Sequence, residues 1–165
     1  MKILYIAFFV ICILFSCKSG VFENDLSTLL NVEDVQILSM ERIDVSGGLR
    51  KSYLMEVYEL SPSNIDSFTN SKKILPENNE YGPWEKYGWS NCHEKINEDI
   101  KLIVLTSDWG DKKLGIKLDS INHILNNNRG YFAFYCKPTI EEPEYVQFFV
   151  LDTLKNTLYI MDSNM

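Results

Sequence analysis

The chain has 165 residues and a mass of 19.2 kDa, a size typical of one folded domain. Aspartate and glutamate outnumber lysine and arginine by 23 to 16, and the resulting net charge of −7 disfavours binding to the phosphate backbone of nucleic acids. Hydrophobic residues make up 45% of the chain and charged residues 24%, which excludes a disordered or fibrous protein.

The first residues have the pattern of a signal peptide. Met1 and Lys2 precede an apolar run over residues 3–15, and polar sequence begins only after Ser16 and Cys17. The run is shorter than the roughly 20 residues that a helix needs to cross the hydrocarbon core of a membrane. The sequence therefore predicts a cleaved export signal over residues 1–16, and not a permanent membrane helix.

The end of this run resembles the lipobox of bacterial lipoproteins. Leu14 lies three positions before Cys17, and the small Ser16 lies directly before it. The resemblance covers residues 1–17 only. It implies cleavage before Cys17, which then carries a diacylglycerol thioether and an N-linked fatty acid such as palmitate. The alternative is a plain secretory signal in which Cys17 has no special role.

The resemblance also implies a location. Two lipid attachments are enough for stable anchoring, so the membrane is an expected partner through the lipid on Cys17, in the bacterial cell envelope. Lys18 stands where some lipoproteins have an aspartate that resembles an inner-membrane retention signal, which favours the outer membrane. Residues 17–33 are predicted to be a short tether with one helical turn near residues 26–30, and residues 34–165 a single domain.

Two cysteines remain after Cys12 leaves with the signal peptide and Cys17 is acylated. These are Cys92 and Cys136, and outside the cytoplasm they form a candidate disulfide that would stabilise the fold by about 2–4 kcal/mol. The alternative is a catalytic thiolate at one of them.

The first part of the domain is predicted to contain a hairpin and a helix. Residues 35–45 and 52–60 alternate apolar and polar side chains and are separated by a glycine pair, which indicates two antiparallel strands. Ser61 followed by Pro62 is typical of a helix N-terminus, and this helix must end before Pro76. Residues 76–99 follow as a long ordered loop, since they combine prolines and glycines with large aromatic residues.

The second part begins with an apolar run over residues 100–106, which is predicted to be a central strand. Leu114, Leu118, Ile121 and Leu125 then recur at helical spacing. Three strands follow, over residues 131–136, 144–152 and 157–161. The predicted class is α+β: a mainly antiparallel sheet of about six strands, with a C-terminal three-strand meander and two helices packed on one face.

The predicted loop holds the candidate ligand-binding residues, Tyr81, Trp84, Tyr87 and Trp89. Flat aromatic side chains stack on sugar rings and on apolar ligands. The alternative is that these side chains fold back and cover the core. The aromatic residues of the last three predicted strands have the same two interpretations: they form a binding face, or they pack within the sheet and its core.

Signals for catalysis are weak. A thiol hydrolase would use Cys92, His123 and Asp152, but Cys92 lacks the glycine-rich surroundings of a nucleophile. Carboxylates that can pair on a glycoside lie in three predicted loops: Glu98, Asp99, Asp108, Asp111, Glu141, Glu142 and Glu144. No metal site and no cofactor are predicted, because phosphate-binding motifs are absent and the chain has only two histidines.

These patterns predict a membrane-anchored lipoprotein that acts as a non-enzymatic binding or accessory domain in the bacterial envelope. Its expected ligand is a protein or a glycan, and a specific version is an immunity or inhibitor lipoprotein whose acidic body suits a basic partner. The alternative is an envelope hydrolase acting on peptidoglycan or glycans. The oligomeric state is left open.

Overall fold

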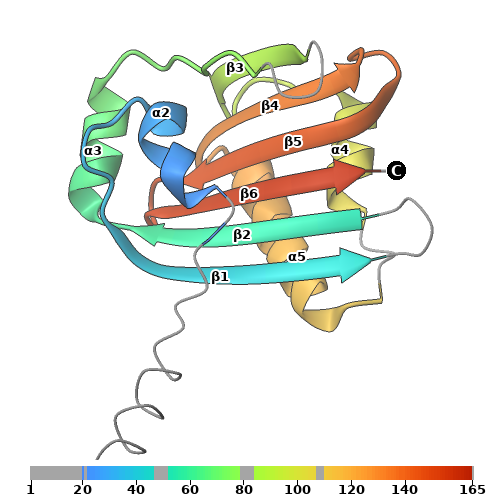
Figure 1. Cartoon of the computed structure of the whole chain (residues 1–165), viewed down its shortest axis with the longest axis horizontal. Coiled ribbons are helices and arrows are strands. Elements are labelled where there is room, and N and C mark those ends of the chain that lie inside the picture. Colours follow the sequence, from blue (N-terminus) through green and yellow to red (C-terminus); the bar gives the residue numbers. More distant parts are fainter. Residues whose placement is uncertain (1–19, 21, 47–51, 79–83, 107–109, 165) are drawn as a thin grey trace, which may run out of the picture.

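Six antiparallel strands form one open sheet in the order β1-β2-β6-β5-β4-β3 (Figure 1). The computed structural model describes residues 20, 22–46, 52–78, 84–106 and 110–164. The strands are β1 (Ile37–Ser46), β2 (Ser52–Leu60), β3 (Glu85–Asn91), β4 (Gly130–Pro138), β5 (Pro143–Asp152) and β6 (Thr157–Asn164). The predicted class is confirmed: the domain is α+β, and β4, β5 and β6 form the C-terminal meander.

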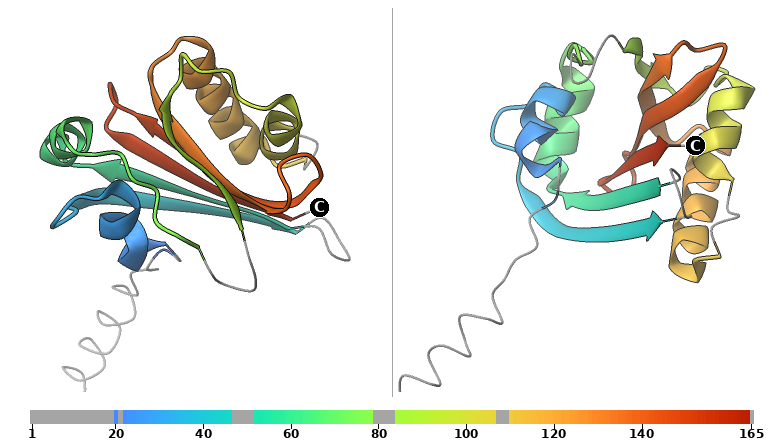
Figure 2. Two further views of the ribbon diagram at one scale, coloured as in Figure 1. Left: turned by 90° about the horizontal axis from the view of Figure 1, so that it is seen from above. Right: turned by 45° about the vertical axis from the view of Figure 1, so that its right-hand side comes forward.

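Helices cover both faces of this sheet (Figure 2). We call the face under α4 (Glu98–Leu105) and α5 (Lys112–Asn126) the closed face. The opposite face, here called the open face, carries the short 3-10 helix η1 (Glu23–Asp25), α2 (Leu26–Leu30) and α3 (Pro62–Asn70) at one end only. Two helices therefore share the closed face, but the two helices predicted from the sequence, α3 and α5, lie on opposite faces.

The predicted strand over residues 100–106 is wrong, because these residues belong to α4. The Asn97 side chain caps the helix by accepting hydrogen bonds from the backbone N–H groups of Asp99 and Ile100. Glu98 and Asp99 in the first turn also suit the positive end of the helix dipole. A short run such as IKLIVL is apolar enough for a buried strand or a buried helix, and the cap decides between them.

The long loop predicted over residues 76–99 contains an edge strand, β3. Its pairing with β4 shifts register between Tyr87 and Ser90, so β3 has a β-bulge beside Gly88. The bulge breaks the apolar-polar alternation by which a strand is recognised in sequence. It also places Tyr87 and Trp89, two positions apart, on opposite faces of the sheet.

The other local predictions are confirmed. The Ser61 hydroxyl accepts a hydrogen bond from the Asn64 N–H at the start of α3, with Pro62 in the first turn. The predicted helical turn near residues 26–30 is α2. The leucine and isoleucine stripe of α5 is buried against the closed face.

Candidate functional site

The four aromatic residues predicted as one ligand-binding group do not form one. Tyr81 lies outside the described residues. Trp89 is only 7% exposed, its indole N–H donates to the Leu29 carbonyl at 3.0 Å, and its ring meets Phe68 edge-on. Tyr87 lies on the closed face, where its ring stacks on Phe134 with centroids 5.1 Å apart. The expectation of a shared binding surface is therefore wrong for Tyr87 and Trp89, which pack with the core.

Trp84 is half-buried and lies on the open face. The Lys137 ammonium lies 4.1 Å from the centre of the Trp84 ring and 4.9 Å from that of Tyr145. The Trp84 ring also meets Tyr135 edge-on at 6.5 Å. Since a cation over an aromatic ring is stabilising by about 0.5–1 kcal/mol at exposed sites, Lys137 holds the two rings in place at the uncovered end of the sheet.

A pocket of about 240 Å³ adjoins this aromatic group on the open face. Its floor is the sheet, and its walls come from the N-terminal end of the described chain and from the segment after α3. Its lining consists of Phe22, Asp25, Thr28 and Leu29 on one side, residues 76–78 on the other, and Tyr135, Gln147 and Phe149 beneath. The pocket combines apolar rings with amide, hydroxyl and carboxylate groups, as ligand sites do.

Hydrogen bonds fix the wall formed by residues 76–78. The Tyr135 hydroxyl donates to the Pro76 carbonyl at 2.6 Å, and the Asn78 amide donates to Gln147 Oε1 at 3.1 Å. Gln147 in turn donates to Asp162 at 3.3 Å. Burial raises the pKa of Asp162, and the Gln147 hydrogen bond and the Lys137 charge lower it in part. A chain of side-chain hydrogen bonds therefore leads from Asn78 through Gln147 to Asp162, from the pocket to the uncovered part of the sheet.

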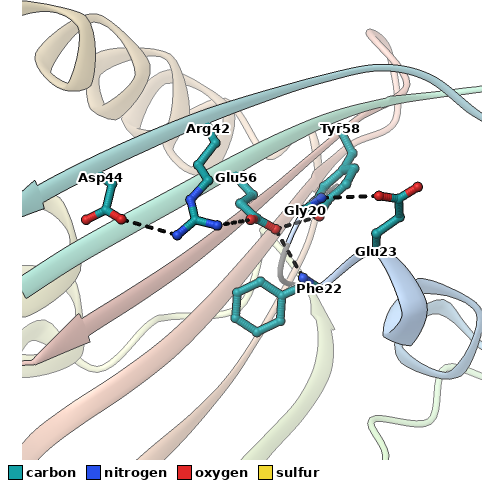
Figure 3. Close-up of polar contacts among 7 residues, drawn as sticks. All are labelled: Gly20, Phe22, Glu23, Arg42, Asp44, Glu56 and Tyr58. Atoms are coloured by element: carbon teal, nitrogen blue, oxygen red, sulfur yellow. Dashed lines mark hydrogen bonds and ion pairs between the residues drawn. The ribbon is translucent and has the colours of Figure 1, made fainter. Parts of the chain in front are cut away.

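The opposite wall is held by Glu56, a fully buried carboxylate on β2 (Figure 3). It accepts hydrogen bonds from the Tyr58 hydroxyl at 2.5 Å and from the Phe22 N–H at 3.2 Å. The Arg42 guanidinium lies 3.8 Å from its other oxygen. Gly20 packs so closely on the Tyr58 hydroxyl that a Cβ atom there would clash. Glu56 thus fixes the N-terminal segment against the sheet.

The candidate disulfide is wrong. Cys92 and Cys136 are both free and buried thiols on the closed face. The Cys92 N–H donates to the carbonyl of Gly130, and Cys136 lies six residues farther along β4. At about 3.3 Å per residue the two are about 20 Å apart, whereas the Cα atoms of a disulfide lie within about 7 Å.

The arrangement around Cys92 also lacks the electrostatics of a thiolate nucleophile. Burial and the negative charge of Asp152 raise the pKa of Cys92 to about 12, so the thiol is protonated at neutral pH. Asp152 accepts hydrogen bonds from the N–H groups of Leu154 and Lys155, and His123 is exposed and contacts Asn127. His123 and Asp152 do line one groove, but neither is bonded to the other or to Cys92 among the interactions of the described residues.

The predicted carboxylates are dispersed. Asp111 caps α5 by accepting from the Leu114 N–H at 2.8 Å, and Asp108 lies outside the described residues. Asp99 lines a shallow groove with Glu141 and Glu142 of the β4–β5 connection and Glu144 at the start of β5. All four are exposed, which is typical of a solvated rim. Within the described segments, no three His, Cys, Asp or Glu side chains are grouped so as to hold a metal ion.

The pocket itself was not predicted, because its lining comes from four segments that lie far apart in sequence. One usable signal was present in the alternation of the strands. Tyr135, Gln147 and Phe149 alternate in step with apolar residues of their own strands, which indicates that they lie on the same face of the sheet. Nothing in the sequence indicated which end of that face the helices leave uncovered. Among the described helices, none combines the length and the apolar character needed to cross a membrane.

No protein-family model, curated protein or solved structure matches this chain.

Proposed function

We propose that this protein is a lipoprotein of the bacterial envelope, anchored through Cys17, that binds a protein or glycan ligand and does not itself catalyse a reaction. The observation that carries the binding role is the uncovered end of the open face, where Trp84, Lys137 and Tyr145 adjoin the pocket. An immunity or inhibitor role is the specific form that a net charge of −7 favours, because it attracts a basic partner.

The geometry of the open face supports binding. Large aromatic residues and a cation are held at a surface that the fold leaves accessible, beside a pocket whose walls are fixed by hydrogen bonds. Pre-formed walls reduce the entropy lost when a ligand binds. The outer membrane is the favoured site of anchoring, on the basis of Lys18.

The anchor is tested by intact-mass measurement on the full chain recovered from a bacterial membrane fraction. We expect the mass of residues 17–165 plus lipid, and the Cys17→Ser variant as control should retain the signal peptide and lack the lipid. Reduction should leave the mass unchanged, and Cys92 and Cys136 should react with iodoacetamide only after unfolding. An unlipidated wild-type chain would overturn the anchor.

The binding role is tested by capturing envelope components on the lipidated protein in detergent. Retention should fall at least about tenfold when Trp84 and Tyr145 are both replaced by alanine. The Leu154→Ala variant should retain the same components, since Leu154 is an exposed apolar residue on a distant turn. Equal retention by all three proteins would rule out this surface as the binding site.

The alternative, an envelope hydrolase, would use the carboxylates of the groove beside α4. Digestion of peptidoglycan by the wild-type chain and by the Asp99→Asn and Glu142→Gln double variant decides it. Hydrolysis that the double variant loses while its fold stays intact would establish the enzyme and overturn the binding proposal. We expect no hydrolysis by either protein.

A further inference from the structure

The pocket on the open face has the dimensions of a site for one side chain. Its volume is about 240 Å³, below the range of about 300–1,000 Å³ that is usual for small-molecule sites. Protein interfaces commonly depend on a few anchor side chains, each inserted into a pocket of this kind. The size therefore favours one residue of a larger partner over a whole organic ligand.

The charge of the pocket selects the type of anchor. Among the described residues that line it, two are carboxylates, Asp25 and Glu77, and none is basic. Lys86 forms an ion pair with Glu77 from outside the pocket, which leaves one net negative charge at its mouth. Asp25 forms no ion pair with any of the side chains that the structure describes. A positively charged group is thus the complement of this site.

The remaining lining suits a long side chain with an apolar stem. Phe22, Leu29 and Phe149 provide apolar surface, and the Thr28 hydroxyl and the two carboxylates can accept hydrogen bonds. Arginine has both parts: a methylene stem that packs on apolar surface, and a planar head with five N–H donors. Lysine offers fewer donors in a less directional group.

We infer that this pocket binds an arginine side chain of a basic protein partner, with the stem between Phe22 and Phe149 and the guanidinium at Asp25. This inference rests on the proposed binding function and specifies its ligand as a protein. Glu56 is a positioning residue for the site, since its carboxylate holds the Phe22 N–H and thereby the wall that carries Asp25.

The probe for the test is N-acetyl-arginine methylamide, compared with the citrulline analogue, which has nearly the same shape and no charge. Full-length protein in detergent micelles is titrated while the side-chain amide signals of Asn78 and Gln147 are followed by NMR. We expect saturable shifts with the arginine probe and at least about tenfold weaker binding of the citrulline probe.

Two double variants separate a specific site from general acidity. Asp25→Asn with Glu77→Gln should weaken binding of the arginine probe at least about tenfold. Asp99→Asn with Glu142→Gln removes the same charge from the groove beside α4 and should leave binding unchanged. Equal binding of both probes, an equal loss in both double variants, or no shift at all would overturn the inference.

The outcome is separable from that of the proposed function. A protein that captures an envelope component through Trp84 and Tyr145 but does not bind the arginine probe refutes the pocket assignment alone. A chain that binds the probe at the pocket but lacks lipid and captures nothing refutes the envelope function alone.

Discussion

Two neighbouring rows of side chains, one on each face of the sheet, show how differently the two faces are used. On the closed face the row is Tyr53, Ser163, Val146 and Cys136, and each of these residues is completely buried. One position along the strands, the open-face row is Leu54, Asp162, Gln147 and Tyr135. Three of these four remain partly exposed, and three carry polar groups. The same strands thus provide a fully packed layer on one side and a partly exposed polar surface on the other.

The difference follows from helix coverage. α4 and α5 extend over the closed face, whereas α2 and α3 cover only one end of the open face (Figures 1 and 2). Uncovered sheet must either remain polar or be covered by a partner, because a large exposed apolar surface promotes association. The open end combines polar groups with aromatic rings, which suits an intermittently occupied surface.

The largest expected effect tests whether the two faces differ in packing, by removing one large side chain from each. Phe148→Ala deletes a fully buried ring that lies between Phe132 and Phe134 on the closed face, and should destabilise the fold by about 3–5 kcal/mol. Tyr145→Ala on the open face should cost about 1 kcal/mol or less, chiefly through the lost contact with Lys137. Urea unfolding of both variants measures the two values. Similar losses would show that the two faces are packed alike.

A smaller effect is expected from Glu56, the buried carboxylate of the open face. Glu56→Ala leaves the Phe22 N–H and the Tyr58 hydroxyl without this acceptor, which should cost about 1–3 kcal/mol. Hydrogen exchange should show loss of protection at the Phe22 amide. The matched control is Glu59→Ala on the same strand, where the side chain is exposed and the cost should stay within about 0.5 kcal/mol. An unchanged Phe22 amide would contradict the assigned role of Glu56.

The smallest effect concerns Asp162 and its pH dependence. Burial raises the folded-state pKa of this carboxyl, so its charged form is disfavoured in the native protein. Wild-type stability relative to Asp162→Asn should therefore be greatest below about pH 3.9, the ordinary aspartate pKa, and should fall as the pH rises through the raised pKa. Urea unfolding between about pH 3 and pH 7 measures this difference.

The exposed Asp119 on α5 provides the control for that titration, through Asp119→Asn. A stability difference between wild type and Asp162→Asn that stays constant with pH would contradict the raised pKa. A difference that grows in favour of the wild type as the pH rises would show that charged Asp162 is stabilised in the fold.

Local signals determined how much of this molecule could be predicted. The β1–β2 hairpin, the Ser61 cap, the α5 stripe and the C-terminal meander all depend on residues close in sequence, and these predictions are confirmed. The strand predicted at α4 is wrong because a run of six apolar or long side chains fits the periodicity of a strand as well as that of a helix. β3 was missed because its bulge interrupts the alternation.

The candidate site was harder to predict, for a physical reason. Trp84 and Trp89 look equivalent in the sequence, yet the bulge in β3 and a hydrogen bond to Leu29, 60 residues away, bury only one of them. The pocket likewise depends on contacts such as Tyr135 with Pro76, 59 residues apart. Such pairings are determined by tertiary packing, and no periodicity in the chain reveals them.

The attachment of the N-terminal segment to Glu56 limits the distance between the folded domain and the lipid anchor proposed at Cys17. Gly20 lies against the sheet, and the three residues from Cys17 to Gly20 can extend over no more than about 10 Å. A domain of this length has a radius of gyration of about 15 Å. Under the proposed acylation of Cys17, the protein would have a reach of only a few tens of ångströms, so any partner would have to be in the same bilayer or come up to its surface.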